Sequence, residues 1–334
     1  MKMKNIYRNL LASAGALAAV LSINSAASAL DEITVAYFLE WPTPNQYGQH
    51  HGTYDKALGV KVNWRAFDTG TAMSAAMASG DVHIAFSQGL PPFVVATSAG
   101  QDLQVVDIAV SYSDNDNCVV RSDLGITKAN ASELEGKQAG VPIGTAAHYG
   151  FLKQMEHFGV DVASMKVVDM APADGAAAFA NGSLDMVCGW GGALRRMKEH
   201  GNVLLTGAEK EELGIKVIDL TTVPSAFAAE YPDIVEAFVK ETARLNAEYT
   251  GGKADEMIAD IAKEAGMDIE GTKATLAGFS FPTVAEQNSK KWFGGGMQTF
   301  LKEVADFFVA QGNIPSARAS YDSAVNGAFL KAAQ

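Results

Sequence analysis

The sequence lacks the short motifs that mark the common enzyme classes. It contains no G-x-S-x-G elbow, no H-E-x-x-H helix, no P-loop and no G-x-G-x-x-G following a strand. No nucleophile–base pair shows by spacing, although a catalytic triad is assembled in space and need not be visible in a sequence. We therefore expect no catalytic site and no cofactor, and the sequence favours binding chemistry over catalysis.

Cysteine is scarce, with only Cys118 and Cys188 in 334 residues. Their spacing fits no zinc motif, and we expect no metal site. In an oxidising compartment an even count permits one disulfide, while the alternative is two buried thiols that behave as small apolar side chains. The six histidines include the neighbours His50 and His51. Adjacent residues do not face one side of a helix, so we interpret them as a surface pair.

Positive charge is also in short supply, with 26 basic against 38 acidic side chains and a net charge of −12. The first 29 residues carry three basic side chains and no acidic ones, so the remainder has a net charge of about −15. Such a balance argues against nucleic acid and against an anionic membrane surface as partners. The remaining length of about 305 residues is enough for two domains of ordinary size.

One apolar run stands out, and it lies at the start of the chain. Lys2, Lys4 and Arg8 precede an apolar stretch at 10–23, which is followed by the small residues 27–29. This order is typical of a secretory signal peptide, with cleavage after Ala29 and delivery to the periplasm. No later stretch is long and apolar enough to span a bilayer.

Beyond this segment, strands and helices alternate, which predicts an α/β fold with parallel sheets. Strands are expected at 33–41, 60–67, 81–86, 103–111, 117–121, 138–141, 166–169, 184–190, 203–206 and 217–220. Helices are expected at 49–58, 68–78, 90–98, 144–159 and 173–181, and again at 232–250, 252–265, 271–278, 284–292 and 297–311. The helical tail has no evident site of its own and is expected to pack on the first domain.

One internal echo predicts two similar halves. Residues 75–86 resemble residues 177–188, since each stretch is an alanine-rich helix, a glycine stop and a buried strand. Two such units suggest two lobes whose strand ends point to a shared cleft.

Aromatic side chains gather where the predicted strands end. Tyr37, Phe38 and Trp41 lie in the turn at the end of the stretch 33–41, and Phe86 and Trp190 close two later strands. Open α/β sheets bind ligands outside the carboxyl ends of their strands. Several aromatic faces around one point attract a methylated onium group, which has no N–H to donate. The alternative is that these side chains serve packing and surface anchoring.

Polar groups lie near the same strand ends. Helix starts at 69–71, 87–89 and 144–146 offer free N–H groups with Ser87 and Thr145, which suits a carboxylate or sulfonate; the alternative is plain helix capping. His148, in the first turn of a helix, suits a neutral donor. Asp116 and Asn117 would suit a primary ammonium, unless this polar run is only a solvated turn.

Several segments together resemble a known family. They are 33–37, 62–68, 78–82, 134–137 with 141–142, 145–149 and 187–190. The chain is similar in them to the periplasmic solute-binding proteins of taurine, nitrate and sulfonate ABC importers. That resemblance implies the two-lobed periplasmic-binding-protein fold (type II), with 30–117 and 221–334 as one lobe, 118–220 as the other, two crossing strands as hinge and a helical C-terminal segment.

The same resemblance implies a monomer that delivers its ligand to a membrane permease. Carried to matching positions, it places Tyr37, Phe86, Ser87, Asn117, Thr145, His148 and Trp190 in the pocket. Our hypothesis for the ligand is a small zwitterion with a methylated onium head, such as dimethylsulfoniopropionate or glycine betaine. The head would lie among Trp41, Trp190 and Phe86, and the tail near Ser87 and Thr145. Taurine, with its ammonium on Asp116 or Asn117, is the alternative ligand. Two other classes of protein remain as alternatives to an importer component: a secreted enzyme, and a structural or adhesive protein.

Overall fold

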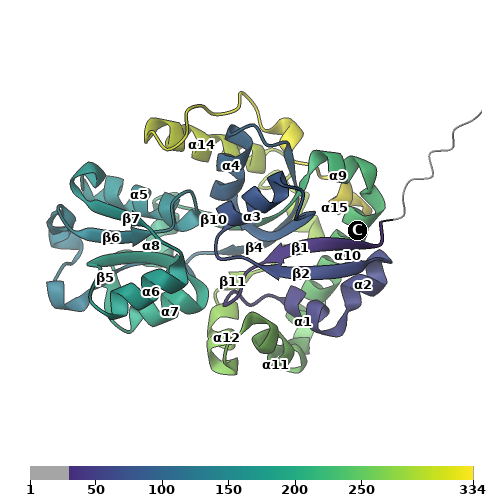
Figure 1. The fold of residues 1–334 in the computed structure, drawn as a ribbon, viewed down its shortest axis with the longest axis horizontal. Helices are drawn as coiled ribbons and strands as arrows, with labels where there is room; N and C mark the ends of the chain where they lie inside the picture. The colour runs from purple at the N-terminus through teal and green to yellow at the C-terminus, as the bar shows by residue number, and fades with distance from the viewer. Residues whose placement is uncertain (1–29, 334) are drawn as a thin grey trace, which may run out of the picture. The chain divides into compact units, whose positions relative to one another are not determined.

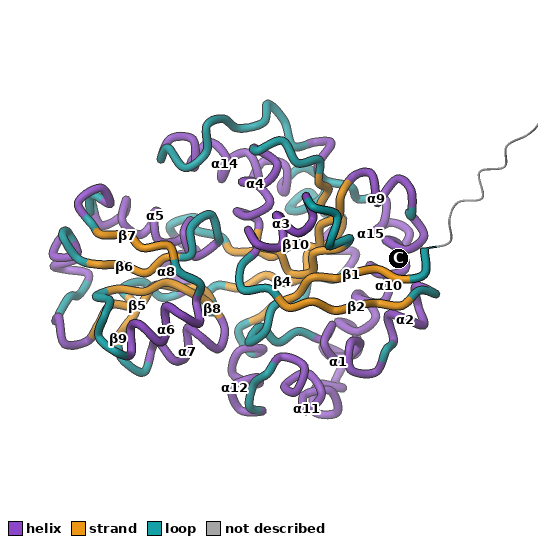
Figure 2. The backbone as a smooth tube through the Cα atoms, in the orientation of Figure 1, coloured by secondary structure: helices purple, strands orange, loops and turns teal. Residues whose placement is uncertain are grey.

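The computed structural model describes residues 30–333, so the predicted signal peptide and its cleavage after Ala29 lie outside the described part. Within it, the named strands form two sheets (Figure 1). The order is β11-β4-β10-β3-β1-β2 in the six-stranded sheet and β7-β6-β8-β5-β9 in the five-stranded one. Figure 2 shows the strands of the two sheets as two separate groups with helices around each. None of the described helices is long and apolar enough to cross a membrane.

The six-stranded sheet is mixed, where the sequence predicted parallel pairing. Its strands are β1 (Glu32–Tyr37), β2 (Lys61–Ala66), β3 (Ile84–Gly89), β4 (Leu103–Tyr112), β10 (Val217–Pro224) and β11 (Phe279–Ser280). β1 lies parallel to β2 and β3, as expected for strands joined by helices. β10 runs antiparallel to both β3 and β4, because the chain enters this strand from the other sheet.

The five-stranded sheet repeats this arrangement. Its strands are β5 (Asp116–Arg121), β6 (Gln138–Val141), β7 (Lys166–Asp169), β8 (Met186–Trp190) and β9 (Gly201–Val203). β7, β6 and β8 are parallel, and β5 is antiparallel to β8 and β9. The series β2-β1-β3-β10 therefore matches β7-β6-β8-β5, as the internal echo predicted. The chain passes between the sheets after β4 and again before β10, and we propose two lobes divided close to the boundaries expected at 117 and 220. The strand bounds themselves put 116–117 in the second sheet and 217–220 in the first.

Helices cover both sheets. Those between the strands of the first sheet and after it are α1 (Pro44–His51), α2 (Thr53–Leu58), α3 (Gly70–Ala78), α4 (Leu90–Ser98), α9 (Ser225–Glu230), α10 (Pro232–Glu248), α11 (Ala254–Ala265), α12 (Ile269–Leu276), α13 (Val284–Gln287), α14 (Gly296–Ala310) and α15 (Ala328–Ala332). Those among the strands of the second are α5 (Ala146–Phe158), α6 (Pro172–Ala180), α7 (Gly191–Lys198) and α8 (Gly207–Glu212). Short turns of 3₁₀ helix occupy Ser122–Leu124, Lys128–Leu134, Val162–Ser164 and Asp322–Ala324, and a π turn spans Tyr249–Lys253.

The helical tail packs on the first sheet and its helices, as predicted. α10 packs against α1 and α2, α11 against α1, and α14 against α4, while β11 extends the sheet beside β4. The tail also contacts the helices around the five-stranded sheet, since α12 packs against α7. Asn115 donates a hydrogen bond to the carbonyl of Thr275 at the end of α12 (2.8 Å).

Several sequence-based predictions of local structure were wrong, and some helices were missed. The strand predicted at 203–206 lies earlier, at Gly201–Val203. The helix predicted at 49–58 begins earlier, at Pro44, and is divided by Gly52, whose φ of +60° favours glycine. The strand predicted at 81–86 runs from Ile84 to Gly89, because the polar residues 87–89 are buried in the sheet rather than in a turn. α7 was not predicted, since Gly191 and Gly192 at its start look like helix breakers; Gly191 has a φ of +55° and no room for a Cβ beside the carbonyl of Glu40.

The two cysteines form a disulfide. β5 and β8 pair antiparallel with Cys118 directly opposite Cys188, and the two side chains are bonded. The sequence left open whether the two cysteines form a disulfide or remain buried thiols, and the structure shows the disulfide.

Candidate functional site

A cavity lies at the strand ends of both sheets. It is lined by Phe38, Trp41, Gly70, Gly89, Pro92, Tyr112, Asp116, Thr145, Ala146, Trp190 and Asp219. Trp190 is the last residue of β8, and Phe38 and Trp41 follow the end of β1. The cavity is therefore where an open α/β sheet presents a ligand site.

Half of the predicted site residues line this cavity. Those that do are Phe38, Trp41, Asp116, Thr145 and Trp190. Each of the three helix starts that the sequence singled out also contributes, through Gly70, Gly89 and Thr145 with Ala146.

The two other predicted aromatic residues, and Ser87, lie outside the lining. Tyr37 packs edge-on against Trp64, with ring centroids 6.1 Å apart. Phe86 packs toward Phe238 at 6.3 Å, because β3 continues past it to Gly89 and its ring faces the helix layer. Ser87 is buried and does not line the cavity itself. Its hydroxyl accepts a hydrogen bond from Trp41, which does line the cavity.

The remaining two predicted residues are also turned away. Asn117 donates to the carbonyl of Leu205 (2.8 Å), and its side-chain oxygen accepts from Cys118 N (2.9 Å). His148 accepts a hydrogen bond from Gly144 N at Nδ1 (3.1 Å). Burial lowers the pKa of His148 to about 4, which keeps its imidazole neutral, as its place at a helix start suggested.

A hydrogen-bonded chain fixes one wall of the cavity. Trp41 Nε1 donates to Ser87 Oγ (3.0 Å), which donates to Asp219 Oδ2 (2.8 Å). Tyr112 donates its hydroxyl to Asp219 Oδ1 (2.8 Å). Ser87 has a φ of +60°, a conformation that a residue other than glycine adopts at a cost, and such strain is common at functional sites. Asp219 thus orients both aromatic rings through its two oxygens.

Aromatic rings form two groups around the space. Trp41 lies 4.8 Å from Tyr112 and 4.5 Å from Phe279, measured between ring centroids. Phe38 lies 5.9 Å from Trp190. Tilted and edge-on contacts are the arrangements that aromatic pairs prefer, and they hold the rings in place.

Asp116 is the least satisfied polar group of the cavity. It is 2% exposed, and its Oδ2 is buried without a hydrogen-bond partner in the described part of the chain. Burial raises the pKa of Asp116 to about 7, an effect opposed in part by the ammonium of Lys210. The Lys210 ammonium donates to the backbone carbonyls of Ser113 (2.9 Å) and Asp116 instead of to the carboxylate. Burial likewise raises the pKa of Asp219 to about 7. A buried carboxylate oxygen with no partner is costly, so it calls for a proton, a donor or a cation.

The helix starts in the lining offer backbone donors. Thr145 caps α5, donating its hydroxyl to the Pro142 carbonyl (2.6 Å) and accepting from His148 N (3.4 Å). Gly70 and Gly89 lie at the starts of α3 and α4. Free N–H groups and the positive helix end suit an anion. Among the described residues that line the cavity, none is Lys, Arg or His.

Sequence reasoning missed Tyr112 and Asp219 as lining residues, and Phe279 behind Trp41. One signal for Asp219 was present, since a single carboxylate in the apolar run 217–220 must be buried with partners. Phe279 comes from the tail, far from the other residues in sequence.

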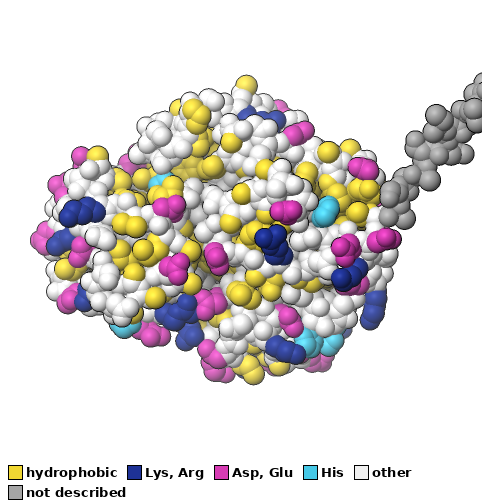
Figure 3. All heavy atoms as spheres, in the orientation of Figure 1, with side chains coloured by type: hydrophobic (Ala, Val, Ile, Leu, Met, Phe, Trp, Pro, Cys, Tyr) yellow, Lys and Arg dark blue, Asp and Glu magenta, His cyan; other side chains and the backbone are white. Residues whose placement is uncertain are grey.

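On the outer surface, the face shown in Figure 3 carries acidic side chains throughout and only separate groups of Lys and Arg, in line with the acidic composition.

The comparisons with known proteins identify the family and the fold. The NMT1/THI5-like family matches residues 43–247, more than half of the chain. The taurine-binding periplasmic protein of Escherichia coli (strain K12) is 27% identical over 320 residues, which is 94% of this chain and 97% of that protein. The alkanesulfonate-binding protein SsuA from Xanthomonas axonopodis pv. citri, bound to MOPS, superposes with a TM-score of 0.73 at 19% identity, covering 90% of this chain and 99% of that one.

An enzyme shares the fold as well. The desulfurization enzyme DszB superposes with a TM-score of 0.65 at 14% identity, covering 91% of this chain and 99% of that one. These structural likenesses confirm the predicted periplasmic-binding-protein fold. The chain belongs to the NMT1/THI5-like family, and the predicted resemblance to the solute-binding proteins of taurine and sulfonate importers is confirmed.

Proposed function

We propose that this protein is the periplasmic solute-binding component of an ABC importer and not an enzyme. We further propose that its cavity takes a small zwitterion with a methylated onium head, such as dimethylsulfoniopropionate or glycine betaine. The observation that supports this ligand class is the set of four aromatic rings in the cavity lining, with the buried carboxylate of Asp116 among them.

The head of the ligand is assigned to the aromatic and acidic side of the cavity. A methylated onium ion cannot donate an N–H, but it gains from π faces and from nearby negative charge. Phe38, Trp41, Tyr112 and Trp190 supply the faces, and Asp116 supplies the charge. Phe86 had this role in the sequence-based hypothesis; because its ring packs toward Phe238, Phe38 and Tyr112 replace it here.

The anionic tail is assigned to the helix starts. No basic side chain lines the described cavity, so a carboxylate would rely on N–H groups near Gly70 and Thr145. The start of α4 after Gly89 contributes less, because Pro91 and Pro92 have no N–H. Carboxylates and helix N–H groups in one lining are what a zwitterion requires, and Asp116 and Asp219 disfavour a simple anion.

Taurine is the second candidate, and its support is the 27% identity to a taurine-binding protein. A primary ammonium has three N–H donors, which Asp116 and Asp219 can accept. The tail would be a sulfonate on the same helix starts. In this case the rings of Trp41 and Trp190 would act mainly as packing.

An enzyme on this fold is the rival class, since DszB has it. Both cysteines are bonded in the disulfide, so neither thiol is available as a nucleophile. Turnover of a bound small molecule would support an enzyme rather than a binding protein. A structural or adhesive role would instead predict that no small solute binds.

Calorimetric titration at pH 8 with dimethylsulfoniopropionate, glycine betaine, choline and taurine tests the proposal. We expect tight binding of a methylated zwitterion and weak binding of choline, which has the head without the anionic tail. Tight binding of taurine alone would leave the importer role and reject the methylated head. Binding of none of the four would reject the proposed ligand class.

A further inference from the structure

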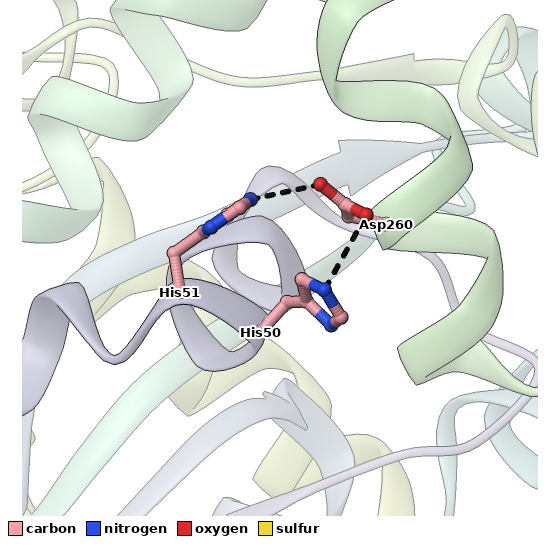
Figure 4. A group of neighbouring side chains, drawn as sticks. All are labelled: His50, His51 and Asp260. Carbon is pink, nitrogen blue, oxygen red and sulfur yellow. Dashed lines mark hydrogen bonds and ion pairs between the residues drawn. The ribbon is translucent and has the colours of Figure 1, made fainter.

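A second cluster of ligand-forming side chains lies away from the cavity, where α1 packs against α11 (Figure 4). His50 and His51 end α1, and Asp260 and Glu264 lie one turn apart on α11. His51 Nε2 is 2.8 Å from Asp260 Oδ2, and His50 Nε2 is 3.5 Å from Asp260 Oδ1. The two histidines lie at the surface, as the sequence predicted, but the expectation that they face different sides was wrong, because both rings turn toward one carboxylate.

The hydrogen bonding of His50 leaves an electron-rich centre. Its Nδ1 lies 2.8 Å from Glu264 Oε1, close enough to donate the ring proton there. In the neutral imidazole this leaves Nε2 with only a lone pair, facing a carboxylate oxygen that is also an acceptor. Two facing acceptors call for a proton, a water molecule or a metal ion between them.

We propose that His50 Nε2, His51 Nε2 and Asp260 bind a divalent transition-metal ion, with Zn²⁺ as the best fit. Two imidazoles and a carboxylate are a common ligand set for Zn²⁺, with bonds of about 2.0–2.2 Å. The ligand atoms of these three residues all lie within 4.8 Å of one another, so small side-chain rotations bring them onto one ion.

Glu264 supplies the outer support that such sites use. A metal-bound histidine usually donates its other ring N–H to a carboxylate, which fixes the tautomer and raises the basicity of the ligating nitrogen. The side chains of His50 and His51 are 24% and 43% exposed, so an ion can enter from solvent and keep a water in its fourth position.

An ion here would brace the segment that carries part of the cavity wall. α1 begins directly after the loop with Phe38 and Trp41, and Glu40 N in that loop donates to the carbonyl of Ala265 at the end of α11 (2.7 Å). The ion would thus join the two helices on either side of this loop. The metal site does not depend on which solute the cavity takes.

The test is calorimetric titration of the untagged protein with ZnCl₂ and with NiCl₂ at pH 7.5, alongside thermal melting. We expect one ion per chain and a higher Tm with the metal. His51→Gln and Asp260→Asn are expected to weaken binding at least tenfold, and Glu264→Gln about 10–100-fold. His200→Gln, which changes an exposed histidine outside the cluster, is the matched control.

Circular dichroism and the metal-free Tm of each variant show whether it folds. Absence of one-to-one binding in the wild type would overturn the proposal, leaving protons as the charge between the rings and the carboxylates. Equal affinity in the His51→Gln and His200→Gln variants would also overturn it, because the ion would then lie elsewhere.

Discussion

The guanidinium of Arg196 donates two hydrogen bonds to the carboxylate of Glu40, one of them from Nη2 at 3.0 Å. The contact joins α7, which follows β8 of the second sheet, to the loop after β1 of the first. The backbone of Glu40 takes part as well, since its carbonyl accepts from Gly192 N (3.0 Å). Glu40 has a φ of +55°, so this link is made in a strained conformation close to the cavity wall.

We expect Arg196→Ala to weaken ligand binding by up to about fivefold. The pair is partly exposed, and such ion pairs contribute about 1 kcal/mol or less. If the two halves separate when the cavity opens, the pair favours the closed arrangement, and its loss lowers apparent affinity. Titration by calorimetry measures the change. Lys240→Ala, which removes an ion pair within α10, serves as control, and an equal effect in that variant would refute a specific role for Arg196.

The aromatic wall predicts a second effect. Trp190→Ala should cost about 1–2 kcal/mol of binding free energy for a methylated onium ligand, while Trp190→Phe should restore part of it. Trp190 is only half-buried, so its removal threatens the fold less than removal of Trp41 does. Phe307→Ala, a half-buried aromatic that packs on Tyr149 outside the cavity, is the control. Unchanged affinity in Trp190→Ala would remove this ring from the site.

The sequence predicted the parts of the site that depend on local pattern. Strand ends after β1 and β8 follow from prolines, glycines and apolar runs, and they led to Phe38, Trp41 and Trp190. Asp219 and Tyr112 could not be placed in this way, because they meet only when β10 returns antiparallel between β3 and β4. That pairing links segments about 100 residues apart, and no local pattern encodes it.

The polar stretch at 87–89 misled the prediction for a physical reason. Ser87 and Gln88 look like turn residues, yet both are buried, and hydrogen bonds to Asp219 and Thr222 satisfy them. Extending β3 by three residues moves Phe86 from a strand end into the interior. The contact of His50 and His51 with one acidic helix was not predicted either. That helix lies about 210 residues further along the chain, so no local pattern indicates the contact.

The raised pKa values of Asp116 and Asp219, each about 7, predict that affinity for a ligand with a cationic head falls as the pH is lowered. Below pH 7 protonation removes the negative charge that attracts the head, so affinity should fall by up to tenfold per pH unit for each proton taken up. Calorimetry between pH 8 and pH 5.5 measures this. In Asp116→Asn the affinity at pH 8 should be lower and its pH dependence weaker; an unchanged slope would contradict a role for Asp116.

The same carboxyl group predicts a gain in stability for the ligand-free protein. The pKa of Asp116 is higher when folded than its ordinary value near 4, so the folded state binds more protons between pH 4 and 7, and stability falls as pH rises through that range. Asp116→Asn removes this cost, and we expect unfolding free energy to rise by about 1–3 kcal/mol at pH 8. Denaturant titration should show the gain shrinking toward pH 4. A loss of stability at pH 8 would mean that the Lys210 ammonium outweighs the cost of burial.

The disulfide gives the last prediction, because it lies beside the cavity wall. Asp116 is directly opposite Trp190 in the pairing of β5 with β8, two residue pairs from Cys118 opposite Cys188. Replacing both cysteines by alanine releases a link across 70 residues and should cost about 2–4 kcal/mol of unfolding free energy. The ladder of hydrogen bonds between the strands remains, so affinity measured well below the new Tm should fall less than threefold. A larger loss would show that the disulfide also holds Asp116 and Trp190 in register for the ligand.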